Sequence, residues 1–494
     1  MKKKLKRVSC LLFILMLTCL PWFLEYLFAK ERVEKIDELL NLYYSFGELN
    51  GAVLVAENGK IIYKKAFGLA NRELNVSNQT DSRFNIHSMS KQFTAALIMQ
   101  LKEEGKLKLD GKISDYLPAY PKEIGEKVTI HQLLTHTHGI PEPDYNKLPL
   151  DISGPADKVL KEYMSKPFKF EPGSKFEYSG LVGYAILGAI IEKLSGKSYE
   201  EVLTRRILKP LNMKNSGYAN DRKIVEKKST SYIKTRDYRF EKRVRNVDPL
   251  FTGATNIYST VDDLYLWDRA LSTGPLLTKE SRDLLLARHA NVPYNSTLFY
   301  GYGWYITDFE LAGKKRFLAE HGGGRCNAII RAPHEDRLVV LLGNTTSVYP
   351  WEITHKLMQI LYNGTYELPK RSLQEALYKI IEKKGIEAAI PEYHRLKKEF
   401  PDTYEFHMME LSDLGYLYYS QGKMKKSIEI FKFNLELFPD QFAMYHGLGD
   451  AYKEVGKRDL AIKNLKKALE LNPRKEDWEK NIYKQTQKIL KELE

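Results

Sequence analysis

Cysteine is scarce in this sequence, with only three among 494 residues. Cys10 and Cys19 lie close to the N-terminus, so Cys326 stands alone in the rest of the chain. A single cysteine there excludes an intrachain disulfide beyond the N-terminal segment, and it excludes a zinc site built from cysteines. The fold must therefore be stabilised by its hydrophobic core.

The excess of positive over negative charge is also small for a chain of this length. The 77 Lys and Arg residues oppose 63 Asp and Glu residues, for a net charge of +14. No stripe of basic residues with interleaved aromatics stands out, so no nucleic-acid partner is expected. Hydrophobic residues at 43% and charged residues at 28% are typical of globular proteins and exclude a disordered or fibrous chain.

The N-terminal segment has the pattern of an export signal. A cluster of lysines and Arg7 precedes an apolar run from Val8 to Leu24. Positive charge before an apolar stretch is typical of a secretory signal, and the run lies near the lower limit for crossing a bilayer of about 30 Å. We expect residues 1–30 to be a signal peptide or membrane anchor. The protein would then be extracytoplasmic (periplasmic, secreted or anchored), and it would meet a membrane only through this segment.

The next part of the chain predicts one mixed domain over residues 31–365. Residues 51–68 should form a β-hairpin, because Asn58-Gly59 favours a type I′ turn. Apolar residues at helical spacing predict helices from Ser88 to Gly105 and over 184–194. Strand-like segments follow near 298–308, 325–332 and 337–343. A sheet assembled from both ends of the domain is therefore expected.

A repeat of 34 residues occupies the C-terminal part. Its landmarks Leu414-Gly415, Gly422 and Pro439 recur as Leu448-Gly449, Gly456 and Pro473. Glycine lets two helices approach closely, and this pattern resembles tetratricopeptide repeats. We expect a helical linker or degenerate repeat over 366–406, two repeats over 407–474 and a capping helix over 475–494. The array would bind a protein partner or, alternatively, only shield one face of the preceding domain.

Ser88-Met89-Ser90-Lys91 places a hydroxyl and an amine one helical turn apart on one face. A serine becomes a strong nucleophile only when a base takes its proton. Lysine can do so only if its pKa lies well below about 10.4. Spacing alone is weak support, since Ser231-Tyr-Ile-Lys234 and Ser420-Gln-Gly-Lys423 also match.

The order of several motifs strengthens the case for Ser88. They are Phe84-Asn-Ile-His-Ser-Met-Ser-Lys, Leu133-Leu-Thr-His-Thr-His-Gly139, Phe176-Glu-Tyr-Ser179, Tyr258-Ser-Thr-Val-Asp-Asp-Leu264, Gly301-Tyr-Gly-Trp304 and His321-Gly-Gly-Gly324. This series resembles the serine β-lactamase-related family of class C β-lactamases, DD-peptidases and esterases. The resemblance implies an α/β (α+β) fold, with an antiparallel sheet flanked by helices plus a helical lobe, ahead of the all-α repeat array.

The resemblance also implies roles for individual residues. Ser88 would be the acylated nucleophile, Lys91 its base or electrostatic helper, and Tyr178 the phenol that shuttles the proton. His321 would stand where class C enzymes have the lysine of Lys-Thr-Gly. The backbone N–H groups of Ser88 and Gly324 would form the oxyanion hole. Substrate would lie along Gly322 and Gly323, near Arg325.

Two departures from the family pattern affect the expected substrate. Gly180 replaces the asparagine of Tyr-x-Asn and has no amide with which to bond Lys91 or a substrate carbonyl. His321 replaces a fixed positive charge, because histidine has an unperturbed pKa of about 6.5. Recognition of the carboxylate of penicillins or D-Ala-D-Ala would be weakened, unless Arg325 restores a cation. Esters and amides without that carboxylate become better candidates.

No metal or cofactor is expected. His131, His136 and His138 do not have the spacing of a zinc site, and the segment that follows them resembles a turn. Helix-capping and turn roles are therefore expected for these histidines. Cys326 is interpreted as a packed thiol, and Trp267 and Trp304 as core residues.

These features together predict an exported serine hydrolase that forms an acyl-enzyme on Ser88. Esterase or D-amino-acid amidase/peptidase activity on a small-molecule, peptide or ester substrate is the first hypothesis. A β-lactamase or DD-carboxypeptidase acting on cell-wall-type substrates is the second. The alternative from another class is a catalytically idle, repeat-bearing binding protein, for which Gly180 is the main support.

Overall fold

The computed structural model describes residues 29–143, 165–219, 223–243, 252–274, 276–293, 295–346 and 350–494. The expected export signal therefore falls almost wholly outside the described residues. The chain divides into two compact units. The first comprises Met1–Ile233 and Glu241–Glu367, and the second comprises Lys234–Phe240 and Leu368–Glu494. None of the described helices is long and apolar enough to cross a membrane.

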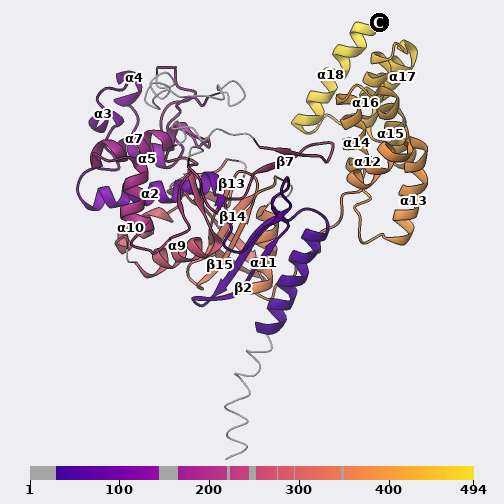
Figure 1. Cartoon of the computed structure of the whole chain (residues 1–494). Helices are drawn as coiled ribbons and strands as arrows, with labels where there is room; N and C mark the ends of the chain where they lie inside the picture. Colours follow the sequence, from indigo (N-terminus) through magenta and orange to yellow (C-terminus); the bar gives the residue numbers. More distant parts are fainter. Residues whose placement is uncertain are drawn as a thin grey trace, which may run out of the picture. The chain divides into compact units, whose positions relative to one another are not determined.

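An eight-stranded antiparallel sheet forms the centre of the first unit, in the order β10-β11-β12-β13-β14-β15-β1-β2 (Figure 1). Its strands are β1 (Gly51–Glu57), β2 (Lys60–Phe67), β10 (Ala290–Asn291), β11 (Leu298–Tyr300), β12 (Tyr305–Leu311), β13 (Lys314–Gly323), β14 (Asn327–Ala332) and β15 (Arg337–Gly343). The N-terminal strand β1 pairs with the last strand β15, from Gly51 opposite Gly343 to Glu57 opposite Arg337. The expectation of a sheet assembled from both ends of the domain is confirmed.

The predicted hairpin is formed by β1 and β2. Glu57 pairs with Lys60, which leaves Asn58 and Gly59 as the two loop residues. Their φ angles of 52° and 67° are both positive, as a type I′ turn requires. The sequence-based expectation for this turn is confirmed.

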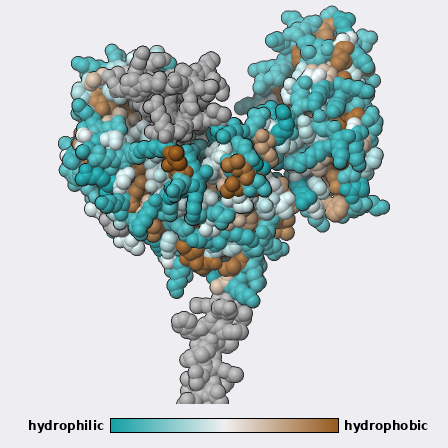
Figure 2. All heavy atoms as spheres, in the orientation of Figure 1, coloured by the Kyte–Doolittle hydropathy of each residue, from teal (hydrophilic) through white to brown (hydrophobic). Residues whose placement is uncertain are grey.

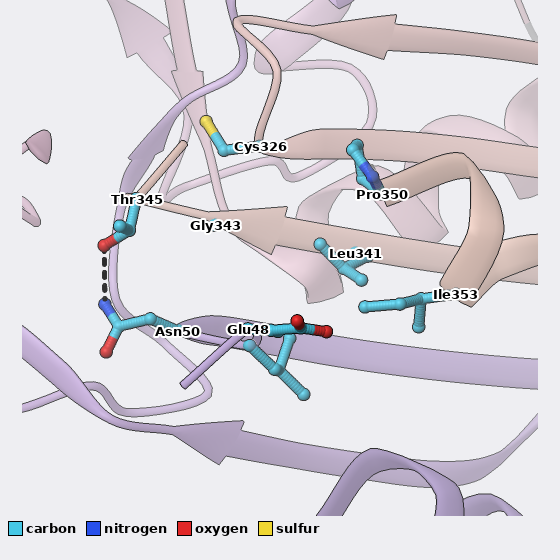
Figure 3. Close-up of a pocket in the computed structure, with 9 residues that line it drawn as sticks. Glu48, Asn50, Cys326, Leu341, Gly343, Thr345, Pro350 and Ile353 are labelled. Carbon is cyan, nitrogen blue, oxygen red and sulfur yellow. Dashed lines mark hydrogen bonds between the residues drawn. The ribbon is translucent and has the colours of Figure 1, made fainter. Parts of the chain in front are cut away.

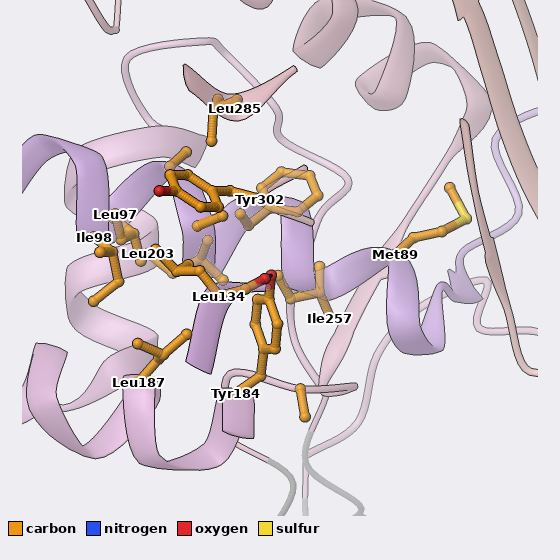
Figure 4. Close-up of a cluster of buried hydrophobic side chains, with 14 of the residues drawn as sticks. Met89, Leu97, Ile98, Leu134, Tyr184, Leu187, Leu203, Ile257, Leu285 and Tyr302 are labelled. Carbon is orange, nitrogen blue, oxygen red and sulfur yellow. Dashed lines mark hydrogen bonds between the residues drawn. The ribbon is translucent and has the colours of Figure 1, made fainter. Parts of the chain in front are cut away.

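Both faces of the sheet are buried. Successive side chains of β1 point to opposite faces, and each face packs into its own apolar cluster. Ala52 and Leu54 belong to one apolar cluster, whereas Val53 and Val55 belong to another. The second cluster is closed by the helix over residues 29–45 and by α11 (Pro350–Leu361). The first continues into the helical lobe, part of which Figure 4 shows.

The helical lobe consists of helices from the middle of the chain. They are α2 (Ser90–Glu103), α3 (Ile113–Tyr116), α4 (Lys122–Gly125), α5 (Ile130–Leu134), α7 (Val182–Ser195), α8 (Tyr199–Leu203), α9 (Val261–Thr273) and α10 (Lys279–Leu285), with the short helices η1 (His87–Met89) and η2 (Thr204–Leu208). The two helices predicted from apolar spacing are α2 and α7. Trp267 and Trp304 are both fully buried, which confirms their interpretation as core residues.

The remaining strands form small separate sheets. They are β3 (Leu69–Asn71) with β4 (Val76–Ser77), β9 (Ile257–Ser259) between β5 (Phe84–Asn85) and β6 (Gly217–Tyr218), and β7 (Tyr232–Lys234) with β8 (Phe240–Lys242).

The second unit is wholly helical apart from its hairpin segment. Its helices are α12 (Leu373–Lys384), η4 (Ile386–Ala388), α13 (Ala389–Glu399), α14 (Met408–Ser420), α15 (Met424–Leu437), α16 (Phe442–Glu454), α17 (Arg458–Leu471) and α18 (Asp477–Leu493). A Cβ on Gly415 would lie 2.5 Å from the ring of Phe431, and a Cβ on Gly449 would lie 2.7 Å from Leu465. These paired close approaches recur with the repeat and explain Gly415 and Gly449, whereas Gly422 and Gly456 have positive φ angles of 71° and 74°. The boundaries at 366–406, 407–474 and 475–494 stay predictions.

Hydrophilic residues cover most of the described surface seen in the space-filling view, and apolar residues form only small separate spots there (Figure 2). Most of the apolar content of both units is therefore internal, as a chain without disulfide support in its described part requires.

The sheet meets the helical lobe where β13 ends against η1. A Cβ on Gly323 would lie only 2.1 Å from the carbonyl oxygen of Ile86. Backbone atoms occupy that space, so no rotamer change can relieve the collision. Glycine at this position therefore fixes how closely β13 approaches the start of α2.

We expect Gly323→Ala to lower the free energy of unfolding by about 1–3 kcal/mol, because the added methyl overpacks a rigid contact. Gly125→Ala is the matched control, since Gly125 is also buried but its added Cβ would make only ordinary contacts from 3.5 Å. Urea unfolding of both variants measures the difference. Equal stability of the two would contradict the close approach.

Candidate active site

Ser88 lies in η1, directly before the first turn of α2. It is half-buried, whereas its neighbours His87 and Met89 are buried. His87 has a φ of 49°, a left-handed conformation that a non-glycine residue adopts at some cost. Ser90 points inward, and its Oγ accepts a hydrogen bond of 3.1 Å from the backbone N–H of Ile257. The turn thus holds Ser90 in the core while Ser88 keeps access to solvent.

Lys91 is completely buried one turn after Ser88. Its Nζ donates to the backbone carbonyl oxygens of Gly180 at 2.7 Å and of Ala254 at 3.3 Å. The rings of Tyr178 and Tyr184 lie 5.3 and 5.5 Å from the same nitrogen. Burial lowers the pKa of Lys91 to about 7, and the nearby carboxylate of Glu142 opposes this by favouring the charged form.

One of these contacts could not be expected from the sequence. Gly180 lacks the side-chain amide of the family motif, yet it does bind Lys91, through its backbone carbonyl. A neutral amine has two N–H groups, which match the two carbonyl acceptors. Its lone pair then remains available to accept a proton.

Tyr178 lies in the segment before α7 and is half-buried. Its ring stacks on Tyr305, with centroids 6.1 Å apart and planes at 21°. It also lies 6.2 Å from the ring of His321. The structure therefore brings Lys91, Tyr178 and His321 together around one aromatic cluster, which also contains Tyr300.

His321 lies in β13 with only 1% of its surface exposed. Its Nδ1 is 2.7 Å from the carbonyl oxygen of Gly322, so Nδ1 carries the proton and donates. Its Nε2 is then the acceptor for the hydroxyl of Tyr300, at 3.2 Å. Burial and the proximity of Lys91 lower the pKa of His321 to about 3. The imidazole is therefore neutral at physiological pH and offers no fixed positive charge.

The glycines after His321 have packing partners on opposite sides of β13. A Cβ on Gly322 would lie 2.7 Å from the indole of Trp351, and one on Gly324 would lie 2.2 Å from the ring of His87. Gly324 and Arg325 both have positive φ, and the N–H of Cys326 closes the turn on the Gly323 carbonyl at 3.2 Å. Arg325 is exposed at this turn. The roles of Gly322, Gly323, Gly324 and Arg325 toward substrate stay predictions.

The three histidines of the 131–138 segment form separate hydrogen bonds. His131 Nδ1 contacts the hydroxyl of Tyr302 at 2.8 Å, and His138 Nδ1 accepts from the N–H of Ile140 at 3.0 Å. His136 Nδ1 accepts from the N–H of Ser179 at 3.1 Å, and burial lowers its pKa well below the usual value. Within the described ranges, no three acidic, histidine or cysteine residues group as metal ligands would.

Cys326 is buried, and burial raises the pKa of its thiol to about 12, which fits a packed thiol rather than a nucleophile. It lines a cavity of about 10 Å³ that is also bordered by Asn50, Thr345 and Ile353 (Figure 3). That volume suits about one water molecule, so the cavity is too small to hold a substrate.

Sequence reasoning missed Glu142, Tyr300 and Tyr305. Tyr300 belongs to β11 and Tyr305 to β12. Because β11 pairs with β12 and β12 pairs with β13, the sheet brings both side chains to His321. Glu142 follows Pro141, next to an expected turn, and its contacts are made across more than thirty residues of sequence. No spacing signal marks any of the three.

Comparison with known proteins supports the resemblance drawn from the motifs. A family model for beta-lactamase matches residues 44–352, and a tetratricopeptide repeat model matches residues 442–475. A penicillin-binding protein of Bacillus subtilis (strain 168) is 29% identical over 385 residues, which are 72% of this chain and 81% of that protein.

Solved structures give the same fold. The octameric penicillin-binding protein homologue from Pyrococcus abyssi is 27% identical, with a TM-score of 0.61 over 71% of this chain and 82% of that one. The D-amino acid amidase from Ochrobactrum anthropi shares the fold at 20% identity, with a TM-score of 0.58 over 68% of this chain and 99% of its own. The predicted fold class is confirmed. The chain belongs to the beta-lactamase family, as a serine hydrolase of that family with a tetratricopeptide repeat in its C-terminal part.

Proposed function

We propose that this chain is an exported serine hydrolase that acylates Ser88, with esters or D-amino-acid amides and peptides as its preferred substrates. The observation that carries the proposal is the pairing of a half-exposed Ser88 with a buried Lys91 one turn away. Lys91 has a pKa of about 7 and both of its N–H directions occupied by carbonyls, so it can act as a base near neutral pH.

The proposed reaction has two steps. Ser88 Oγ attacks the substrate carbonyl carbon while its proton passes to the lone pair of Lys91, directly or through the Tyr178 hydroxyl. The N–H groups of Ser88 and Gly324 stabilise the oxyanion. The proton then passes through Tyr178 to the leaving group, whose bond to the acyl carbon breaks. Water, or another nucleophile, attacks the acyl-enzyme by the reverse proton path and releases Ser88.

The substrate class is inferred from charge. His321 is neutral and engaged with Tyr300, so the position of the family's fixed lysine charge holds no cation. Arg325 is exposed on the adjacent turn. Substrates without a carboxylate at that place therefore fit better. The likeness to a D-amino acid amidase agrees with this choice, whereas the likeness to a penicillin-binding protein of Bacillus subtilis favours the second candidate, a β-lactamase or DD-carboxypeptidase.

Export and partner binding complete the proposal. The basic residues and apolar run of residues 1–30 support a location outside the cytoplasm, with that segment as the membrane contact if it is not cleaved. The repeats support a protein partner, because stacked helical pairs present extended binding surfaces. An idle repeat-bearing binding protein is the outcome if Ser88 does not react.

Intact mass after exposure to a fluorophosphonate, and separately to benzylpenicillin, tests acylation. We expect a fluorophosphonate adduct in the wild type that Ser88→Ala abolishes. Ser420→Ala is the matched control, because Ser420 and Lys423 have the same spacing in the repeat region. An adduct or turnover with penicillin would establish the second candidate. No adduct from either reagent would overturn the enzyme proposal.

The acylation rate should depend on pH through Lys91. Because burial lowers its pKa to about 7, the amine is protonated and unable to accept a proton below that pH. The rate of acylation by an uncharged ester should fall about tenfold per pH unit below pH 7 and reach a plateau above it. Stopped-flow measurements between pH 5 and 9 test this. A rate that is flat across that range would contradict a base of this pKa.

His321→Lys should favour substrates that carry a carboxylate, because it introduces an ammonium where the wild type has a neutral imidazole. We expect the second-order rate constant for penicillin acylation to rise at least tenfold relative to that for the fluorophosphonate. Tyr300→Phe is the control, since it removes the hydroxyl that bonds His321 and adds no charge. An unchanged ratio in His321→Lys would refute the electrostatic argument for the substrate class.

A further inference from the structure

We propose that Glu142 is a positioning residue for the acylation site, which holds the segment 178–182 so that the Gly180 carbonyl remains on Lys91. The proposal rests on the proposed function of Ser88 and Lys91. In the family motif the asparagine of Tyr-x-Asn would contact the lysine, and here Gly180 replaces it. The proposal assigns the positioning of the Lys91 contact to Glu142, which is distant in sequence.

The carboxylate of Glu142 contacts the chain on both sides of Gly180. On the N-terminal side it accepts the hydroxyl of Ser179 in a short hydrogen bond. On the C-terminal side it accepts the backbone N–H groups of Leu181 at 3.1 Å and Val182 at 3.0 Å. Because these three donors lie in the residues directly before and after Gly180, the peptide group of Gly180 has little freedom to rotate.

The same contacts cap α7. Leu181 is the N-cap of α7 and supplies no side-chain hydrogen bond to the first turn. Glu142 accepts two of the N–H groups that the helix start leaves open, those of Leu181 and Val182, and its charge suits the positive end of the helix dipole. Ser179 extends the network, since its Oγ accepts the N–H of Gly183 at 3.1 Å. The orientation of Gly180 is thereby tied to a 14-residue helix.

Glu142 also acts on Lys91 through charge. Burial is the larger influence and lowers the pKa of Lys91, and the Glu142 carboxylate partly offsets it. The other groups around Lys91 are the phenols of Tyr178 and Tyr184 and the imidazoles of His136 and His321. Both imidazoles have lowered pKa values and are neutral near pH 7. His138 also lies within the electrostatic influence of Glu142, but burial lowers its pKa to about 4, so it is neutral as well.

The test compares Glu142→Gln with Glu177→Gln. Glu142→Gln is nearly isosteric, but it removes the charge and one acceptor. We expect the midpoint of the acylation pH profile to move to lower pH by about one unit, since an opposing charge near an amine is lost. The plateau rate should fall about tenfold or more, because the Gly180 peptide is freed. Glu177 precedes Tyr178 and pairs with Lys169 and Lys175, so its variant should leave midpoint and plateau unchanged.

A second variant separates position from charge. Ser179→Ala keeps the Glu142 charge but removes two hydrogen bonds of the network, the one to Glu142 and the one from the N–H of Gly183. It should therefore lower the plateau and leave the midpoint in place. It also decides the matter if Glu142→Gln does not fold. A purely structural role would reduce thermal stability in Glu142→Gln while midpoint and plateau stay at wild-type values, and that result would overturn the proposal.

Hydrogen exchange of the peptide over residues 176–183 gives a readout that does not need activity. Glu142→Gln should speed exchange of the Leu181 and Val182 amides, and Glu177→Gln should not. If wild-type Ser88 fails to acylate, the proposed function falls, and this exchange alone decides whether Glu142 holds the segment. If Ser88 acylates and exchange is unchanged in Glu142→Gln, the positioning role falls by itself.

Discussion

The burial of one amine is the constraint on which the site depends. Lys91 lies in the core between the helical lobe and the sheet, where a charged ammonium is disfavoured. Two backbone carbonyls, from Gly180 and Ala254, satisfy the donors of a neutral amine. In the proposed mechanism this buried amine would be the base, beside the ring of Tyr178, and Ser88 would need only to reach the edge of this core.

The packing directly before Ser88 explains the glycine-rich end of β13. Gly323 approaches the backbone of Ile86, and Gly324 lies against the ring of His87, immediately before Ser88. Side chains at these positions would push the strand away from the turn that carries Ser88. His321, on the same strand, is held neutral by burial and by Tyr300. His321 therefore contributes no charge near neutral pH, and in the proposed function the shape of the site and its backbone N–H groups would select the substrate.

The sequence allowed the local elements to be predicted wherever one rule dominated. Asn58-Gly59 required a type I′ turn, apolar spacing gave α2 and α7, and the 34-residue period gave the helical pairs. The motif order indicated Ser88, Lys91, Tyr178 and His321 as one site. Contacts made by backbone atoms could not be predicted, because glycine carries no side-chain signal: the Gly180 carbonyl on Lys91 is the clearest case. Glu142, Tyr300 and Tyr305 reach the site only through tertiary packing.

The central claim is that Lys91 is neutral near physiological pH, and its titration can be observed directly. Carbon-13 NMR of the protein labelled at the lysine ε-carbon, with Lys91→Met to assign the signal, follows that one amine among the other lysines. The account predicts a midpoint near pH 7 for Lys91, set by its burial. A midpoint near the ordinary value of 10.5 would contradict it, because the amine would then be charged and unable to accept the proton of Ser88.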